Sequence, residues 1–290
     1  MMQSLNTLAA LLFLALTSVS GEVVSSDATQ VGHEKGKIRF FYDDEYVQDS
    51  CSVVVILGVG TAMTVNDYQD LAFEITSGTN AVTVFADHNP DWFVKTDPEA
   101  YASLANELVS DLAAVIPLCE SKTPLIAIGG HSSSGMAAVK ALPLLHFVPD
   151  GFVGLDPFDF EETPSIPMPS LLWGFAETTC AVSVEKAAKI AFEGANRNSR
   201  VFFQIQNLHE ELTHCSFSDK GCEIVCPERE GSDLVRRAVG VSLQIFTAAL
   251  VHGHSLDRKL FETVLVDTAL EAKLFVNHDE VLVPLQIASE

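Results

Sequence analysis

Short β-branched apolar runs alternate with segments of helical periodicity along most of this chain, and this alternation restricts the possible folds more than any other feature. Residues 52–57 (SVVVIL) are apolar without interruption, which is typical of a strand buried on both faces of a parallel sheet. The pattern predicts strands at 37–42, 52–57, 81–86, 125–128, 151–155, 170–175 and 201–205, and helices at 68–76, 98–118, 136–145, 184–195 and 232–250. This order predicts an α/β fold with a doubly wound, mostly parallel sheet flanked by helices.

The chain is long enough to form one large core, with 290 residues of which 48% are apolar. We expect a single domain over residues 37–290, preceded by a flexible polar segment at 22–36. Residues 1–21 carry no charged side chain and contain the apolar run LAALLFLALT. This run has the length of a signal peptide and is short for a membrane anchor, so we expect cleavage near Gly21 and entry into the secretory pathway, with no transmembrane anchor in the mature chain.

The formal net charge of −22 disfavours partners that are themselves anionic. Nucleic acid and anionic lipid surfaces are therefore not expected as partners, whereas a neutral or cationic small molecule is acceptable. The six cysteines of a chain in the secretory pathway predict disulfides, although six cysteines allow fifteen pairings and the sequence does not select one. A zinc site formed by Cys215, Cys222 and Cys226 with His214 is the less favoured alternative.

One segment combines a strand, a turn of very small residues and a helix. The strand at 125–128 runs into Gly130-His131-Ser132-Ser133-Ser134-Gly135, the setting that a nucleophile elbow requires. Ser134 occupies a position where glycine is usual, and serine is small enough to be tolerated there. We expect Ser132 to be the nucleophile, with Ser133 as the alternative; a turn that only packs closely or binds phosphate is the non-catalytic interpretation.

A histidine and an acid should follow the serine, each in a loop beyond the carboxyl end of a strand. His214 follows the strand at 201–205 and is the expected general base, with His209 of the same loop as the alternative. Asp156 directly follows the strand at 151–155 and is the expected acid.

Two other carboxylates compete with Asp156 for the role of the acid. Glu177 follows the strand at 170–175, and Asp159 is a more remote candidate. The non-catalytic interpretation of Asp156 itself is a turn formed by the dipeptide Asp156-Pro157.

The remaining site residues concern charge stabilisation and substrate contact. Ser133 should contribute its backbone N–H to an oxyanion hole. A second N–H should come from the loop after the strand at 52–57, where we expect Val59, with Gly60 as the alternative. Trp92 and Phe93 follow the strand at 81–86 and are expected to line a substrate pocket, or otherwise to pack on its rim.

These motifs resemble those of serine esterases in the chlorophyllase and platelet-activating-factor acetylhydrolase branch of the α/β-hydrolase superfamily. The resemblance rests on Gly130-His131-Ser132, on Gly154-Leu155-Asp156-Pro157, on Thr213-His214-Cys215 and on Tyr68-Gln69-Asp70-Leu71-Ala72. It spans residues 37–255 and implies hydrolysis of carboxylic esters with a long apolar portion, of which chlorophyll would be one. The sequence departs from the family pattern at two places. Ser134 occupies a position where glycine is usual, and Gly58-Val59 occupies a position where His-Gly is common.

The expected function is that of a secreted serine esterase that uses a Ser132–His214–Asp156 triad and needs no metal or organic cofactor. Its expected partner is a small-molecule ester with an apolar portion. The altered elbow and the missing His-Gly motivate an alternative from another class, a binding protein that keeps the hydrolase scaffold without its chemistry.

Overall fold

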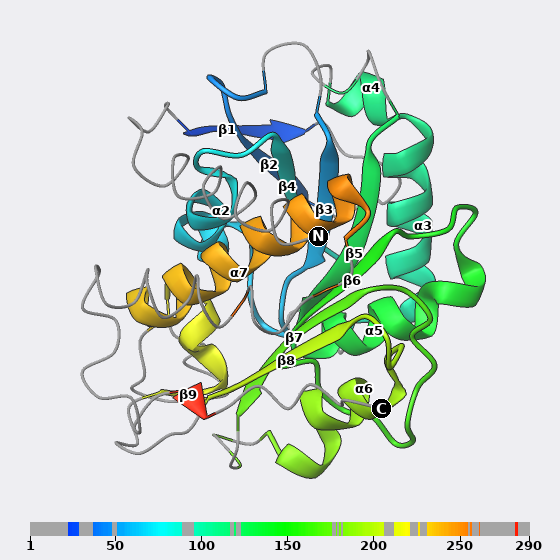
Figure 1. Ribbon diagram of the computed structural model, residues 1–290, viewed down its shortest axis with the longest axis vertical. Coiled ribbons are helices and arrows are strands. Elements are labelled where there is room, and N and C mark those ends of the chain that lie inside the picture. Colours follow the sequence, from blue (N-terminus) through cyan, green and yellow to red (C-terminus); the bar gives the residue numbers. More distant parts are fainter. Residues whose placement is uncertain are drawn as a thin grey trace.

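The computed structural model shows an α/β fold in which helices flank one extended sheet (Figure 1). The structure describes residues 23–28, 37–47, 51–88, 96–116, 119, 123–175, 178, 180, 182–205, 212–220, 226, 231–254, 256, 261 and 282–283. The signal peptide expected at 1–21 lies outside the described residues.

Among the residues that the structure describes, the sheet has nine strands in the order β1-β2-β4-β3-β5-β6-β7-β8-β9. The six strands β4, β3, β5, β6, β7 and β8 pair in parallel, while β1, β2 and β9 join antiparallel. The mostly parallel sheet expected from the sequence is therefore confirmed. The strand bounds are β1 Val23–Ala28, β2 Lys37–Asp43, β3 Val53–Gly58, β4 Ala81–Asp87, β5 Leu125–His131, β6 Gly151–Leu155, β7 Ser170–Phe175, β8 Arg200–Ile205 and β9 Leu282–Val283.

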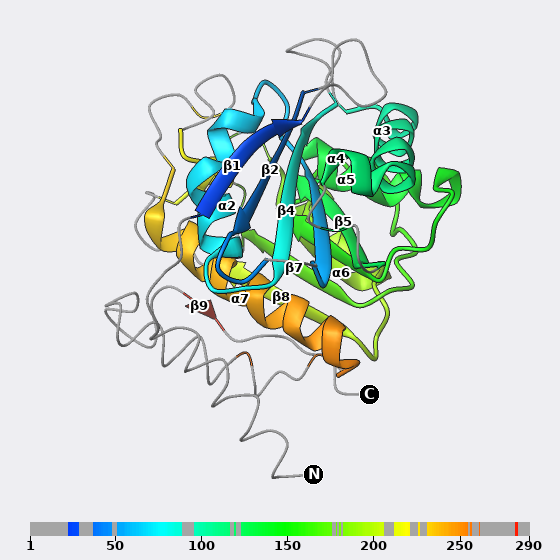
Figure 2. The ribbon, with the colours of Figure 1, turned by 90° about the horizontal axis from the view of Figure 1, so that it is seen from above.

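Helices cover both faces of the sheet, as a parallel sheet requires (Figure 2). One face carries α2 (Gln69–Thr76) and α7 (Asp233–His252), which pack against each other. The other face carries α3 (Pro98–Ser110), α4 (Leu112–Val115), α5 (Ser133–Ala141) and α6 (Ala188–Gly194). Short 3₁₀ segments within the described part of the chain are η1 (Val65–Tyr68), η3 (Leu142–Leu144), η4 (Val184–Lys186) and η5 (His214–Phe217).

Strand β3 shows why an uninterrupted apolar run was required. Its side chains alternate between two separate cores: Val53, Val55 and Leu57 pack on the side of α2 and α7, and Val54 and Ile56 on the side of α3 and α5. Because successive side chains of a strand point to opposite faces, a strand covered on both faces needs apolar residues at every position.

The sequence of helix α7 alone does not show whether this helix crosses a membrane or lies in the core of the fold. The helix has 20 residues and is long and apolar enough to cross a membrane, yet 67% of its apolar 18-residue stretch is buried inside the fold. The helix begins at the N-cap Ser232, whose side chain accepts a hydrogen bond from the Val235 N–H, and ends at Gly253 in the left-handed conformation. This burial is that of a core helix.

Three of the differences from the expected boundaries bear on the fold and the site. The strand β1 lies inside the segment expected to be irregular, where it pairs with β2 at the edge of the sheet. The expected helix at 98–118 is broken at Asp111, which has the non-helical angles φ −110° and ψ 25°. Helix α5 begins at Ser133 rather than at residue 136, so the turn before it is shorter than its run of small residues indicated.

Two disulfides link segments far apart in sequence. Cys51 and Cys119 are bonded near the amino ends of β3 and β5, and Cys180 and Cys226 are bonded beyond the carboxyl end of the sheet strands. The expectation of disulfides is confirmed, and they are compatible with an extracellular or secretory location.

Candidate active site

Ser132 occupies the sharp turn between β5 and α5. Its backbone angles are φ 57° and ψ −129°, a left-handed conformation that costs a non-glycine residue on the order of 1–3 kcal/mol. The turn is held on both sides, because the Ser132 N–H donates to the Leu155 carbonyl (3.1 Å) and its carbonyl accepts from the Phe158 N–H (3.1 Å). The structure therefore holds one serine in strained geometry against the loop that follows β6.

The neighbouring serine has a different environment. Ser133 is the first residue of α5, and its hydroxyl lies 2.8 Å from that of Thr61. Ser133 is 2% exposed and Ser132 is 9% exposed. Left-handed backbone, greater exposure and the position at the turn all favour Ser132 over Ser133 as the nucleophile.

Close backbone approach explains the small residues around the elbow. A Cβ at Gly130 would lie 2.8 Å from the Gly58 carbonyl oxygen and 2.9 Å from the Ser134 Cβ. A Cβ at Gly58 would lie only 2.5 Å from the Ser134 Cβ. The serine that replaces the usual elbow glycine thus fits because Gly58, on the neighbouring strand, has no side chain.

Asp156 and His214 are brought together from different loops. The Asp156 Oδ2 lies 2.7 Å from the His214 Nδ1, and the two residues are 1% and 2% exposed. Because an ionised carboxylate only accepts, Nδ1 carries the hydrogen of this bond, and in the neutral imidazole Nε2 is then left as an acceptor. This is the tautomer that a general base needs in order to take a proton at Nε2.

Asp156, the expected acid, lies one residue beyond β6. Asp156 has φ 43°, and its N–H donates to the Trp173 carbonyl of β7 (2.7 Å). Among the described residues, no hydrogen-bond partner reaches its Oδ1, so the bond to His214 is the polar contact on which the carboxylate depends. Burial of a carboxylate with so few partners costs folding free energy, so stability alone does not account for this arrangement.

The loop that carries His214 is fixed by its own caps. Thr213 is the N-cap of η5: its Oγ1 accepts from the Cys215 N–H, and its N–H donates to the Ser216 hydroxyl. Cys215 is disulfide-bonded. These contacts fix the backbone on both sides of the imidazole.

The end of this loop is anchored to two helices. The Asp219 N–H donates to the Asp67 carbonyl (2.7 Å), and the Asp219 Oδ2 accepts from the Asp70 N–H (3.0 Å). The buried Arg236 of α7 donates to the Ser218 carbonyl (2.6 Å). Burial raises the pKa of the Asp219 carboxyl above its usual value.

His131, between Gly130 and Ser132, is a residue of the candidate site that the sequence analysis did not single out. Its Nδ1 lies 2.6 Å from the Tyr68 hydroxyl, its Nε2 lies 2.9 Å from the His214 carbonyl oxygen, and the two histidine rings have centroids 4.6 Å apart. Burial, together with the nearby His214, lowers the pKa of His131 well below its usual value. Its position inside the elbow motif was the only signal in the sequence.

The expected second oxyanion donor is not supported by the structure. The Val59 N–H donates to the Ala86 carbonyl (3.1 Å), and the N–H of its alternative Gly60 donates to the Tyr68 hydroxyl (3.0 Å). The Val59 N–H is engaged because the pairing with β4 continues one residue beyond β3, and the Gly60 N–H is engaged because the Tyr68 hydroxyl lies within hydrogen-bond distance. Val59 is therefore a correction to the predicted site.

Several expected site residues cannot be placed. Trp92, Phe93, Glu177 and His209 lie outside the described residues. Asp159 is described: it is half-buried with φ 80°, and its N–H donates to the Lys186 carbonyl. Asp156, and not Asp159, has the described hydrogen bond to His214.

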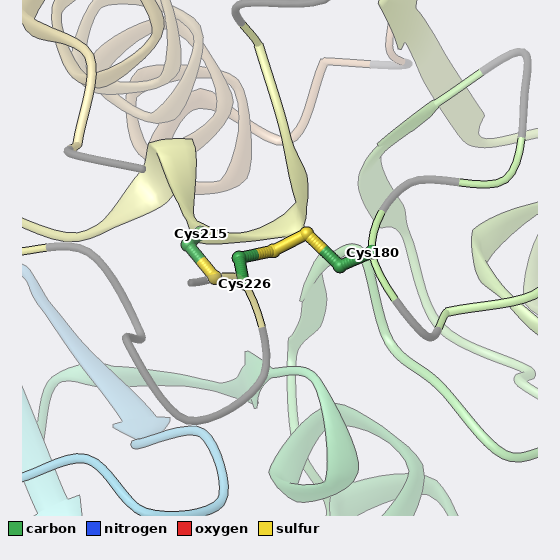
Figure 3. Close-up of side chains that lie close together, drawn as sticks. All are labelled: Cys180, Cys215 and Cys226. Carbon is green, nitrogen blue, oxygen red and sulfur yellow. A yellow bond between two sulfur atoms is a disulfide. The ribbon is translucent and has the colours of Figure 1, made fainter. Parts of the chain in front are cut away.

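The one group of metal-ligating side chains found among the described residues is formed by cysteines. The sulfur atoms of Cys180, Cys215 and Cys226 lie within 4.8 Å of one another, and the disulfide joins Cys180 to Cys226 with Cys215 beside it (Figure 3). All three are oxidised, whereas a metal ligand is a thiolate. The arrangement is therefore a pair of adjacent cross-links, not a zinc site.

A scan against protein-family models and a search of curated proteins both found no match.

Proposed function

We propose that this protein is a serine hydrolase that cleaves carboxylic esters through an acyl-enzyme, with Ser132 as nucleophile, His214 as general base and Asp156 as the acid that orients it. The observation that carries the proposal is the buried Asp156–His214 hydrogen bond at the edge of the sheet where Ser132 is held in a left-handed turn. The carboxyl ends of β5, β6 and β8 meet at this edge, and each of the three residues follows one of these strands.

The proposed chemistry follows from the tautomer of His214. The Ser132 Oγ attacks the ester carbonyl carbon while its proton passes to Nε2, and Asp156 stabilises the imidazolium that forms. The proton then goes to the departing alcohol as the carbon–oxygen bond breaks, which leaves an acyl group on Ser132. A water molecule attacks the acyl group by the same route, giving the carboxylic acid and the free serine.

Two backbone N–H groups support an oxyanion hole in the proposal. The N–H of Ser133, at the start of α5, and the N–H of Thr61 have no hydrogen bond within the part of the chain that the structure describes. The 2.8 Å contact between the Thr61 and Ser133 side chains keeps the two residues adjacent. Thr61 thus replaces Val59 as the proposed second donor.

The substrate class comes from the resemblance of the motifs. The sheet and its helices are compatible with an α/β-hydrolase fold, and the motifs are similar to those of the chlorophyllase and platelet-activating-factor acetylhydrolase branch. That branch suggests neutral esters with a long apolar portion. A secreted protein with disulfides is consistent with this proposal.

A fluorophosphonate probe and short p-nitrophenyl esters test the proposal together. The wild type should label on Ser132, as located by mass spectrometry, and Ser132→Ala should lose both labelling and turnover, by at least about 10⁴-fold in kcat. Labelling on Ser133 would refute the proposed nucleophile. A folded wild type that neither labels nor turns over ester would refute the enzyme and favour a binding protein on a hydrolase scaffold.

A further inference from the structure

A buried chain of hydrogen bonds joins the loop after β3 to the backbone of the base. It runs from the Gly60 N–H to the Tyr68 hydroxyl (3.0 Å), from there to the His131 Nδ1 (2.6 Å), and from the His131 Nε2 to the His214 carbonyl oxygen (2.9 Å). Tyr68 is fully buried and His131 is 1% exposed. This series of hydrogen bonds thus connects three segments of the candidate site through buried groups.

The direction of each bond in this chain is fixed. The His214 carbonyl can only accept, so His131 carries a hydrogen on Nε2, and in a neutral ring its Nδ1 must then accept from the Tyr68 hydroxyl. The Tyr68 oxygen in turn accepts from the Gly60 N–H. The Met63 Sδ also lies 2.9 Å from this hydroxyl, but a ring nitrogen is the stronger acceptor for the single hydroxyl hydrogen.

The neutral state of His131 is consistent with its surroundings. Burial and the neighbouring His214 both lower the pKa of His131, while the hydrogen bond to the His214 carbonyl opposes this to a smaller extent. Burial also raises the pKa of Tyr68 well above its usual value, so its hydroxyl keeps the hydrogen. The ring of Tyr68 stacks on Phe85 with centroids 4.9 Å apart, and the His131 ring lies 5.5 Å from that of Phe217.

We infer that His131 and Tyr68 are positioning residues, a neutral brace that holds the His214 backbone in register with the nucleophile and with the loop that carries Thr61. The inference rests on the proposed function. Its physical reason is that His131 adjoins Ser132 in the chain and bonds directly to the backbone of residue 214, so one side chain fixes both members of the proton-transferring pair. A misplacement of about 1 Å between such groups can cost on the order of 100-fold in rate.

Tyr68→Phe removes the central hydroxyl and retains the ring. We expect kcat for p-nitrophenyl esters to fall on the order of 10- to 100-fold with KM within about twofold, because the brace acts on geometry and not on substrate binding. The matched control is Tyr101→Phe. Tyr101 is also fully buried and donates to the Gly129 carbonyl (2.9 Å), so this variant loses a comparable hydroxyl and should keep the wild-type kcat.

Two substitutions of His131 separate the brace from simple packing. His131→Gln offers an amide N–H toward residue 214 and an oxygen toward Tyr68, whereas His131→Leu fills similar space with neither. Gln should retain several-fold more kcat than Leu. Equal losses in the two variants, at equal thermal stability, would overturn the inference.

An NMR measurement tests the brace without reference to turnover. Long-range ¹H–¹⁵N correlation on the wild type should show His131 as the neutral Nε2–H tautomer, with an Nδ1 shift that changes in Tyr68→Phe. A protonated or Nδ1–H ring would overturn the inference, as would an unchanged kcat in Tyr68→Phe, while probe labelling of Ser132 would leave the proposed function standing. A wild type that fails to label would instead refute the proposed function.

Discussion

The strand ends that hold Ser132 and Asp156 differ sharply from the loop that holds His214. Ser132 and Asp156 each lie one residue beyond a buried strand, with φ 57° and φ 43°. His214 lies nine residues beyond Ile205, the last residue of β8, in a 3₁₀ turn whose residues are not among those with positive φ. Ser132 and Asp156 are held in strained backbone conformations at strand ends, whereas His214 is held by the caps of its own loop and by contacts from outside that loop.

The difference shows two ways of placing a reactive side chain. At a strand end, the neighbouring strands on both sides fix the backbone. The sheet can therefore hold a residue in a conformation that costs on the order of 1–3 kcal/mol. A long loop cannot hold a residue in such a strained conformation. The cost of ordering a loop is the conformational entropy that it loses. Caps, disulfides, the bonds of Asp219 and the brace through His131 together reduce that freedom.

The largest expected effect comes from the strained side of the comparison. In Asp156→Asn, the amide would present a donor or a weaker acceptor to the His214 Nδ1, which disturbs the tautomer that leaves Nε2 as the base. We expect kcat to fall about 10⁴-fold in ester hydrolysis. The free energy of unfolding, measured in urea, should change by no more than about 1 kcal/mol, because a buried charge with one described partner is removed.

Asp159→Asn is the matched control for this prediction. Asp159 lies three residues further along, also has positive φ and was a candidate acid on the sequence alone. Its variant should keep kcat within about twofold of the wild type, because Asp156, and not Asp159, has the described hydrogen bond to His214. A large loss in Asp159→Asn together with a small one in Asp156→Asn would reverse the assignment of the acid.

On the side of the loop, removal of the disulfide beside Cys215 should have an intermediate effect. In the double variant Cys180→Ser with Cys226→Ser, the support of the base loop is lost while the Cys215 bond is not itself replaced. We expect a loss of about 2–4 kcal/mol in unfolding free energy. At a temperature well below the melting transition, kcat should also fall on the order of 10-fold, because the loop of His214 gains freedom.

The other disulfide separates stability from activity. Cys51–Cys119 spans 68 residues against 46 for Cys180–Cys226, so its loss should destabilise the fold at least as much. It lies near the amino ends of β3 and β5, away from the sheet edge beyond which Ser132, Asp156 and His214 lie. Cys51→Ser with Cys119→Ser should therefore keep the wild-type kcat in the same assay, and equal losses of kcat in both double variants would contradict a specific role for Cys180–Cys226.

The same contrast explains what the sequence could predict. The positions of Ser132 and Asp156 follow from the ends of strongly apolar strands, and the strands at 151–155 and 170–175 were predicted to the residue. The pair of His214 with Asp156 was predicted from chain order, although the choice against Glu177 rested on the absence of an aspartate in that loop.

What the sequence could not give depends on contacts between distant segments. The hydrogen bond from the Val59 N–H to the Ala86 carbonyl depends on the course of the chain after β3. The apolar periodicity of the sequence does not indicate that course. The brace of Tyr68, His131 and His214 joins residues 63 and 83 positions apart. The edge strand β1 is stabilised by pairing with β2 rather than by an apolar pattern of its own.

The smallest effect is expected at Ser134, in the first turn of α5 beside the elbow. Its buried hydroxyl donates to the Val59 carbonyl and lies 2.7 Å from the Thr96 hydroxyl, so it ties α5 to the loop that carries Thr61. Ser134→Ala leaves that carbonyl without its donor, which should cost about 1–2 kcal/mol of unfolding free energy. We expect kcat to fall only about three- to tenfold, because the Thr61 N–H shifts without being lost.

Ser242→Ala is the matched control, since Ser242 is equally buried, donates to the Val239 carbonyl (2.8 Å) and accepts from the Trp173 Nε1 (2.9 Å) in the interior of the other face. It should lose similar stability, measured by the same urea titration, and keep the wild-type kcat. Equal kcat values for the two variants would mean that the hydroxyl of Ser134 fills space at the elbow and does not position the oxyanion loop. A selective loss in Ser134→Ala would instead show that the residue departing from the usual elbow glycine holds that loop in place.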